Sequence, residues 1–179
     1  MAAGATIHTF DVTLADVDRG VYESFALRVA RHPSETDAFM VTRLLAYCLE
    51  YEEGIAFTEG VAAKDEPAVL VRDLTGSILA WIEVGAPDAA RLHHGSKLAE
   101  RVAVYTHRNP GPVAAVWAGK KIHRADEIAL HSFEPGFIDD LVGALDRRNT
   151  VTVSITERRL YVELNGTTAE SEVITQTAV

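Results

Sequence analysis

Alternation of apolar and polar residues predicts β-structure at both ends of the chain. Residues 5–13 and 21–31 alternate with a period of two and are separated by a polar turn. This pattern predicts an antiparallel hairpin near the N-terminus. Residues 149–173 contain further alternating segments joined by polar turns, which predict two or three more antiparallel strands.

A change from a period of two to helical spacing predicts a helix at about 34–52. Ser34 is the expected N-cap, and Gly54 marks the expected end. The apolar stripe that repeats at helical spacing consists of Val41, Leu44, Leu45 and Cys48.

The middle of the chain alternates between short apolar runs and helical patterns. Strands are predicted at 67–74, 77–85, 102–106 and 128–133. Helices are predicted at 87–102, 112–119 and 136–146. Such alternation is typical of an α/β layered fold, and the terminal hairpins exclude a purely parallel sheet. We therefore expect an α/β (α+β) domain in which helices flank a mixed sheet.

Composition narrows the class of protein. The 179 residues are 47% hydrophobic and 24% charged, which fits a single globular domain over residues 1–179. The formal net charge of −9 is unlike the basic balance of a typical nucleic-acid-binding protein. The absence of a secretory signal pattern and of a long apolar run predicts a cytoplasmic protein with no membrane span. The one cysteine, Cys48, is expected to be a buried thiol.

Glu83 interrupts the otherwise apolar run ILAWIEV. A central strand that is covered on both faces has this composition. Burying a lone carboxylate is costly unless it is paired, hydrogen-bonded, protonated or bound to a metal. Glu83 is therefore interpreted either as a structural ion pair or strand-end acid, or as part of a functional site.

The alternation of side chains along a strand selects the neighbours of Glu83. It places Trp81 on the same face, and a two-residue turn before the strand would put Ala68 opposite Glu83. A longer loop starting at Asp73 would put Glu66 opposite instead. Both registers leave Glu66 and Glu83 on one face, whereas a three-residue loop would turn Glu66 away. Two such carboxylates can bind a hard cation such as Mg²⁺, or share a proton.

Four segments give the chain a family resemblance: ARHPSET (30–36), FTEG (57–60), DEP (65–67) and WIEVGAPD (81–88). They resemble the bacterial YaeQ family in order and through nearly the whole chain. The resemblance implies a variant of the PD-(D/E)XK, restriction-endonuclease-like fold, a mixed sheet surrounded by helices. Its usual site has a helix glutamate, an acid at the start of one hairpin strand, and an acid-x-Lys on the next.

Carried onto this chain, the resemblance implies that Glu35, Glu66 and Glu83 are catalytic and bind Mg²⁺ or Mn²⁺. A glutamate near a helix start is also favoured by the helix dipole, which is a structural interpretation of Glu35. The position that should carry the lysine carries Gly85.

A basic residue on the following helix can replace the missing lysine. His94 and Lys97 are the candidate catalytic residues there, and Arg91 lies on a related helical face. The alternative is that these side chains form only a solvated helix surface.

Three functions follow from these observations. The first is Mg²⁺-dependent phosphodiester hydrolysis at a nuclease-like acidic site, with nucleic acid as the partner. The second is a catalytically silent binding or regulatory domain on the same scaffold, which the missing lysine and the acidic charge favour. The third is an enzyme acting on a small phosphorylated molecule, which needs less basic surface.

Overall fold

A computed structural model describes residues 4–59 and 65–179, and the ten strands in these ranges form one sheet. The strands are β1 (Thr6–Asp16), β2 (Val21–Arg31), β3 (Ile55–Phe57), β4 (Val69–Arg72), β5 (Ile78–Val84), β6 (Arg101–Tyr105), β7 (Ala129–Phe133), β8 (Arg148–Thr156), β9 (Arg159–Leu164) and β10 (Thr167–Thr177). The helices are α1 (Asp37–Leu49), α2 (Ala89–Leu98), α3 (Pro110–Ala115) and α4 (Phe137–Val142), with a short 3₁₀ helix, η2, at Ala125–Glu127.

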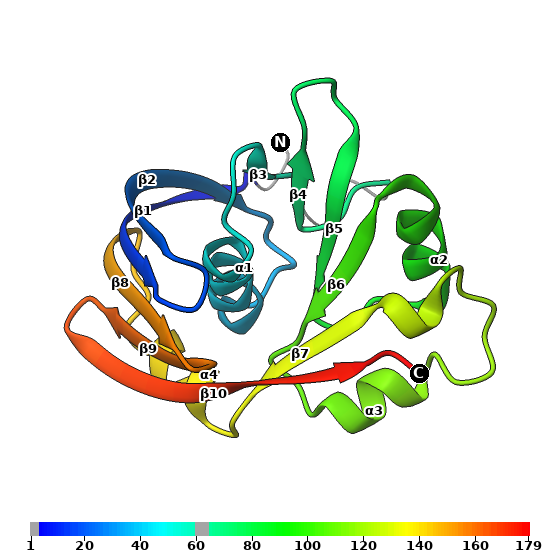
Figure 1. Cartoon of the computed structure of the whole chain (residues 1–179). Helices are drawn as coiled ribbons and strands as arrows, with labels where there is room; N and C mark the ends of the chain where they lie inside the picture. The colour runs from blue at the N-terminus through cyan, green and yellow to red at the C-terminus, as the bar shows by residue number, and fades with distance from the viewer. Residues whose placement is uncertain (1–3, 60–64) are drawn as a thin grey trace.

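The sheet is mixed, as the alternating pattern predicts. Its strand order is β2-β1-β8-β9-β10-β7-β6-β5-β4-β3. β5, β6 and β7 are parallel to one another, while the hairpins β1–β2, β8–β9–β10 and β3–β4–β5 are antiparallel. The sheet curves almost into a barrel around α1, with α2 and α3 on its outer side (Figure 1).

Two long-range pairings join the ends of the chain to its middle. β1 pairs with β8 in parallel, with Val12 opposite Val151. β10 pairs with β9 through its first half and with β7 through its second half. The hairpins at both ends were expected, but these pairings leave no local signal in the sequence.

Helix α1 lies at the centre of the core, where every residue from Met40 to Leu49 is buried. This explains why its apolar character extends beyond one stripe, because a helix covered on all sides has no solvent face. Cys48 lies within it and is fully buried, as expected, and burial raises the pKa of its thiol to about 12. A second apolar cluster packs α2 and α3 against the outer face of the sheet.

The predicted start of the central helix was wrong. The helix begins at Asp37, and Thr36 is the N-cap because its side-chain oxygen accepts a hydrogen bond from Phe39 N at 3.0 Å. The Ser34 hydroxyl instead lies 2.7 Å from the His32 ring. Glu35 therefore directly precedes the N-cap in an irregular segment and does not lie within the helix.

Other boundaries differ by a few residues. The segment expected as a helix at 87–102 divides into α2, capped by Asp88, and the first residues of β6. The short strand β3 was not predicted. In the described residues, no helix has both the length and the apolar character needed to cross a membrane.

Candidate functional site

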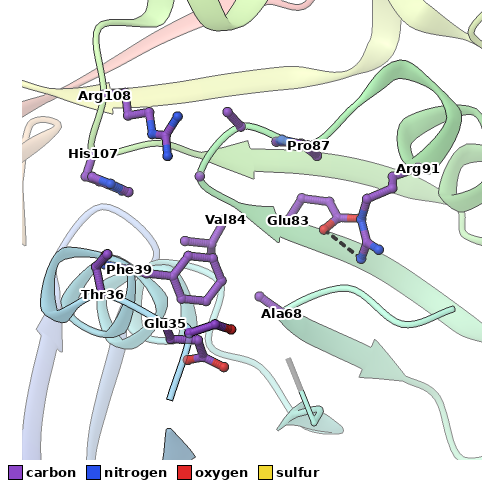
Figure 2. Close-up of a pocket in the computed structure, with 13 residues that line it drawn as sticks. Glu35, Thr36, Phe39, Ala68, Glu83, Val84, Pro87, Arg91, His107 and Arg108 are labelled. Carbon is purple, nitrogen blue, oxygen red and sulfur yellow. Dashed lines mark hydrogen bonds and ion pairs between the residues drawn. The ribbon is translucent and has the colours of Figure 1, made fainter. Parts of the chain in front are cut away.

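A cavity of about 380 Å³ lies between the start of α1, the carboxyl end of β5 and the loop that follows β6. Figure 2 shows Glu35 on the α1 side of this cavity and Glu83 on the β5 side. The residues that line it are Ser34, Glu35, Thr36, Phe39, Ala68, Glu83, Val84, Gly85, Ala86, Pro87, Arg91, His107 and Arg108.

Glu83 is buried and hydrogen-bonded on both oxygens. Its Oε2 accepts hydrogen bonds from Trp81 Nε1 at 2.8 Å and from Arg91 Nε at 3.1 Å, and its Oε1 accepts one from Arg91 Nη2 at 3.2 Å. The contact with Trp81 confirms that the two residues share a strand face. Burial raises the pKa of Glu83, while Arg91 and Trp81 act in the opposite direction. The ion-pair interpretation of Glu83 is thus correct, and the pair lies within a cavity.

Glu35 is buried like Glu83, with a fully covered side chain, but it differs from Glu83 in its hydrogen bonding. Within residues 4–59 and 65–179, neither of its carboxylate oxygens has a hydrogen-bond partner. Its main chain is held firmly: its carbonyl oxygen accepts hydrogen bonds from Arg31 Nε at 3.0 Å and Nη2 at 2.9 Å. The segment before α1 therefore fixes the position of a buried acid whose side chain is left unsatisfied.

The cation nearest to Glu35 is Arg43, whose Nη1 lies 3.9 Å from Glu35 Oε2. Arg43 is itself fully buried, and it donates hydrogen bonds to the carbonyl oxygens of Ala68, at 3.0 Å, and of Thr58. Burial lowers the pKa of Arg43, and the charge of Glu35 opposes this shift. Arg43 thus offsets part of the charge of Glu35 without making a hydrogen bond to it.

Glu66 is not among the residues that line this cavity. Val69 pairs with Ile82 and Leu70 with Trp81, a register that puts Ala68, and not Glu66, opposite Glu83. The half-buried Glu66 lines a neighbouring cavity beside β2 and β3.

The main chain of Glu66 does take part in the site, because its carbonyl oxygen accepts a hydrogen bond from Arg91 Nη2 at 2.6 Å. Asp73 is a turn residue, since its Oδ1 accepts hydrogen bonds from the main-chain N–H groups of Thr75 and Ser77, each at 2.9 Å.

Of the basic residues on α2, Arg91 lines the cavity. His94 and Lys97 are exposed and are not among the lining residues. The His94 ring packs edge-on against Trp81, with 5.6 Å between the ring centroids. The structure therefore does not bring these two predicted catalytic residues to the acidic site.

Sequence reasoning missed His107 and Arg108, which line the cavity from the loop after β6. Burial and the charge of Arg108 lower the pKa of His107, which keeps its ring neutral at neutral pH. The available signal was their place directly after a buried strand, because side chains at the carboxyl ends of parallel strands gather at one edge of a sheet.

The fit of a divalent cation depends on how many protein ligands it needs. In the described part of the chain, no group of three or more His, Cys, Asp or Glu side chains could hold a metal ion. Mg²⁺, however, usually keeps several waters and binds through one or two carboxylates together with the phosphates of its ligand. Both oxygens of Glu35 lack a hydrogen-bond partner among the described residues, and both are buried.

The fold and this cavity define an α+β protein with a mixed, nearly closed sheet and a pocket in which two buried acids lie near arginine and histidine side chains. The chain belongs to the YaeQ family: the family model described as "YaeQ protein" matches residues 1–173.

Named relatives and solved structures agree with this assignment. The "Uncharacterized protein YaeQ" of Salmonella typhi is 33% identical over 165 residues, 90% of each chain. That of Escherichia coli (strain K12) is 39% identical over 117 residues, 65% of this chain and 64% of the other. The crystal structure of YaeQ from Pseudomonas syringae superposes with a TM-score of 0.88 at 32% identity, covering 97% of this chain and 96% of that one. The Xanthomonas axonopodis pv. citri structure gives 0.86 at 26% identity, covering 98% and 99%. These names state no activity, so the chemistry has to be argued from the cavity.

Proposed function

We propose that this protein is a Mg²⁺- or Mn²⁺-dependent phosphodiesterase with a restriction-endonuclease-like arrangement of its site. Glu35 and Glu83 hold the cation, and Arg91, His107 and Arg108 contact the phosphate. The observation that carries the proposal is that Glu35 lines the cavity while both of its buried carboxylate oxygens lack a hydrogen-bond partner among the described residues.

An unpaired buried carboxylate destabilises a fold by several kcal/mol in the absence of compensation. Arg43 supplies only part of that compensation, because it lies 3.9 Å away and directs its hydrogen bonds to carbonyl groups. A hard cation in the cavity would satisfy the free oxygens of Glu35. The geometry is thus suited to a bound cation.

Glu83 would be the second ligand, and Arg91 would contact both the acid and the substrate. Arg91 now occupies the carboxylate of Glu83, and the Glu66 carbonyl anchors the same guanidinium. A planar guanidinium binds a phosphate as readily as a carboxylate, so Arg91 can transfer its hydrogen bonds to an incoming phosphate and leave Glu83 for the cation. Glu66 contributes its main chain to this proposed site and not its carboxylate.

Proton transfer is assigned to His107. Its ring is neutral at neutral pH, and its buried Nδ1 has no hydrogen-bond partner in the described residues. A neutral imidazole can accept a proton from water or return one to a leaving group. The bound cation would stabilise charge on the phosphate and lower the pKa of water.

The substrate that fits best is a small phosphodiester. The cavity has a volume of about 380 Å³, at the small end of the range for ligand pockets, so it suits a phosphate group with a small organic group attached. The formal net charge of −9 disfavours a long polynucleotide, whose binding requires many phosphate contacts. A nucleic-acid end or a low-molecular-weight phosphodiester meets both conditions.

Calorimetric titration with Mn²⁺ tests the cation site. We expect wild type and Glu66→Gln to bind one ion alike, and Glu35→Gln to bind at least roughly tenfold more weakly, because a direct carboxylate ligand is lost. Glu66 is a matched control, since it is an acid of the same type that lines another cavity. Equal affinity in wild type and Glu35→Gln would falsify the assignment.

Hydrolysis of bis(p-nitrophenyl) phosphate, with and without EDTA, then tests activity.

A catalytically silent binding domain is the second candidate, and the Arg91–Glu83 pair favours it. In that pair the acid is already neutralised by a cation of the protein itself. This alternative predicts that calorimetry detects no binding of Mn²⁺. It also predicts that a phosphorylated ligand still binds in EDTA and that Arg108→Gln weakens this binding.

A further inference from the structure

A second polar cavity, of about 310 Å³, lies at the other end of α1. The first cavity includes Glu35 and Thr36 before the helix, and the second includes Leu49 and Glu50 at its end. The helix has 13 residues, and at about 1.5 Å per residue the two cavities are roughly 20 Å apart. The second cavity is therefore distinct from the proposed phosphodiesterase site.

Two stacked aromatic rings form the floor of the second cavity. Tyr105 and His131 are neighbours on β6 and β7, with 4.5 Å between their ring centroids. The Tyr105 hydroxyl donates a hydrogen bond to Glu50 Oε2 at 2.5 Å, and Arg101 pairs with the other oxygen of Glu50. Burial lowers the pKa of His131 to about 4, so its ring is neutral at neutral pH.

Most of the acids that line the cavity already accept hydrogen bonds from the chain. Three of its four carboxylates have both oxygens engaged by N–H or O–H groups of the chain, namely Asp16, Asp18 and Glu50. The fourth, Glu52, is exposed, and its Oε2 lies 4.0 Å from Arg101 Nη2. Three of the four lining acids are therefore already hydrogen-bonded by groups of the protein.

The donors are not used up in the same way. Each side-chain nitrogen of Arg19 makes one hydrogen bond, to Asp16 or to the carbonyl oxygen of Cys48 or Tyr51. Arg158 donates from Nη2 to Thr175 Oγ1 at 2.7 Å, and within the described residues its Nε and Nη1 make no hydrogen bond. An arginine carries five N–H donors, so Arg158 keeps several for a ligand. The cavity thus has N–H donors of Arg158 that the described chain leaves for a ligand.

The chain holds Arg158 in this place at an energetic cost. Glu157 and Arg158 form the turn between β8 and β9 with φ values of 52° and 63°, a region that favours glycine. Each such residue costs about 1 kcal/mol. The Asp18 carboxylate offsets this cost by accepting hydrogen bonds from Glu157 N at 2.7 Å and Arg158 N at 2.9 Å. A strained turn that is clamped in this way fixes the direction in which Arg158 leaves the main chain.

We propose that this second cavity binds a small oxyanion, a carboxylate or phosphate group, between Arg158 and Arg101 above the Tyr105–His131 pair. Both arginines line this cavity together with Tyr105 and His131. Arginine guanidinium groups recognise carboxylate and phosphate through paired N–H···O bonds. The site needs no cation and does not depend on the proposed phosphodiesterase activity.

Calorimetric titration of the full chain with inorganic phosphate and, separately, with succinate tests this proposal. The titrations are done in EDTA at constant ionic strength, and the ¹H–¹³C signals of the His131 ring are followed in parallel. We expect saturable binding that shifts the His131 signals. The tighter of the two probes identifies the preferred oxyanion.

Matched variants locate the bound anion. Arg158→Gln should weaken binding at least roughly tenfold through loss of a charge-assisted contact. Arg159→Gln should leave binding unchanged, because Arg159 pairs with Glu134 and Glu170 instead. Arg158→Gly removes the guanidinium while suiting the left-handed turn, so it should lose binding with an unchanged or higher melting temperature. Absence of saturable binding, or binding that is lost in Arg108→Gln and kept in Arg158→Gln, overturns the proposal.

Discussion

Arg91 donates hydrogen bonds to both oxygens of the Glu83 carboxylate, with Nε 3.1 Å from Oε2 and Nη2 3.2 Å from Oε1. This pair places a fixed positive charge beside the acid, although the sequence has Gly85 where the resemblance implies a lysine. The guanidinium comes from α2, on the far side of the cavity from Glu35 (Figure 2). The same residue therefore competes with a cation for Glu83 and provides donors for a phosphate.

Replacing Arg91 separates these two effects. Arg91→Ala should tighten Mn²⁺ binding by roughly tenfold, because a competing charge within about 4 Å is removed. It should also slow phosphodiester hydrolysis by at least about a hundredfold, since a phosphate contact is lost. Calorimetry and the hydrolysis assay measure the two quantities. Lys97→Ala, an exposed cation of the same helix, is the control and should change neither. Weaker Mn²⁺ binding in Arg91→Ala would contradict the competition.

The charge on Arg43 should be required for folding because Glu35 is buried beside it. Arg43→Met removes the cation nearest to Glu35 and two hydrogen bonds to carbonyl groups, so we expect a loss of about 3–5 kcal/mol in the free energy of unfolding. Urea denaturation measures this loss. The double variant Arg43→Met/Glu35→Gln should recover part of it, because the buried negative charge is gone. A double variant no more stable than the single one would show that the lost hydrogen bonds alone cause the effect.

His131 should make the stability of the fold depend on pH. The pKa of His131 falls from 6.5 to about 4 on folding, so the unfolded chain binds a proton in this interval and the folded chain does not. Stability from this group is therefore complete above pH 6.5 and decreases as the pH falls towards about 4, by about 3 kcal/mol in total.

Urea denaturation across this pH range, compared between wild type and His131→Asn, measures the contribution of His131. The difference between the two curves should change between the two pKa values and be flat above them. A difference that is constant with pH would exclude titration of His131 as its source.

Gly95 should control the position of Trp81. A Cβ atom at Gly95 would lie 2.7 Å from three atoms of the Trp81 ring, which is too close for an ordinary contact. Gly95→Ala should displace the ring from Glu83, destabilise the fold by about 1–3 kcal/mol and shift the fluorescence of the protein. Gly143→Ala is a useful comparison, because nothing lies within 4 Å of a Cβ at that position. Unchanged stability in Gly95→Ala would mean that α2 moves to make room.

The strand face on which Glu83 lies could be predicted from the sequence, but the position of Glu66 could not. Alternation within a strand is local, and it correctly placed Trp81 and Glu83 on one face. The same rule was extended to Glu66, which lies outside the paired residues because β4 begins at Val69. Alternation holds only where the strand is paired, so it does not predict where Glu66 lies. In the structure Glu66 lines another cavity.

The rest of the site depends on contacts between distant parts of the chain. His107 and Arg108 reach the cavity because β5 and β6 are parallel, with Val84 opposite Tyr105. Arg91, and not His94 or Lys97, faces Glu83 because Gly95 lets α2 pack closely on Trp81. Both outcomes follow from tertiary packing, which helical spacing alone does not specify.

The pairing of β1 with β8 has a consequence for how the chain folds during synthesis. The hairpin of residues 6–31 emerges from the ribosome early, yet its inner neighbour is not made until about residue 156. One edge of β1 is open in the meantime, and an open edge is a template for pairing with other chains. Closure also waits for β10, the last strand, which bridges β9 and β7. Folding of the complete sheet is therefore a late and slow event, limited by non-local strand pairing, and a nascent chain that stalls before β8 is the form most exposed to aggregation.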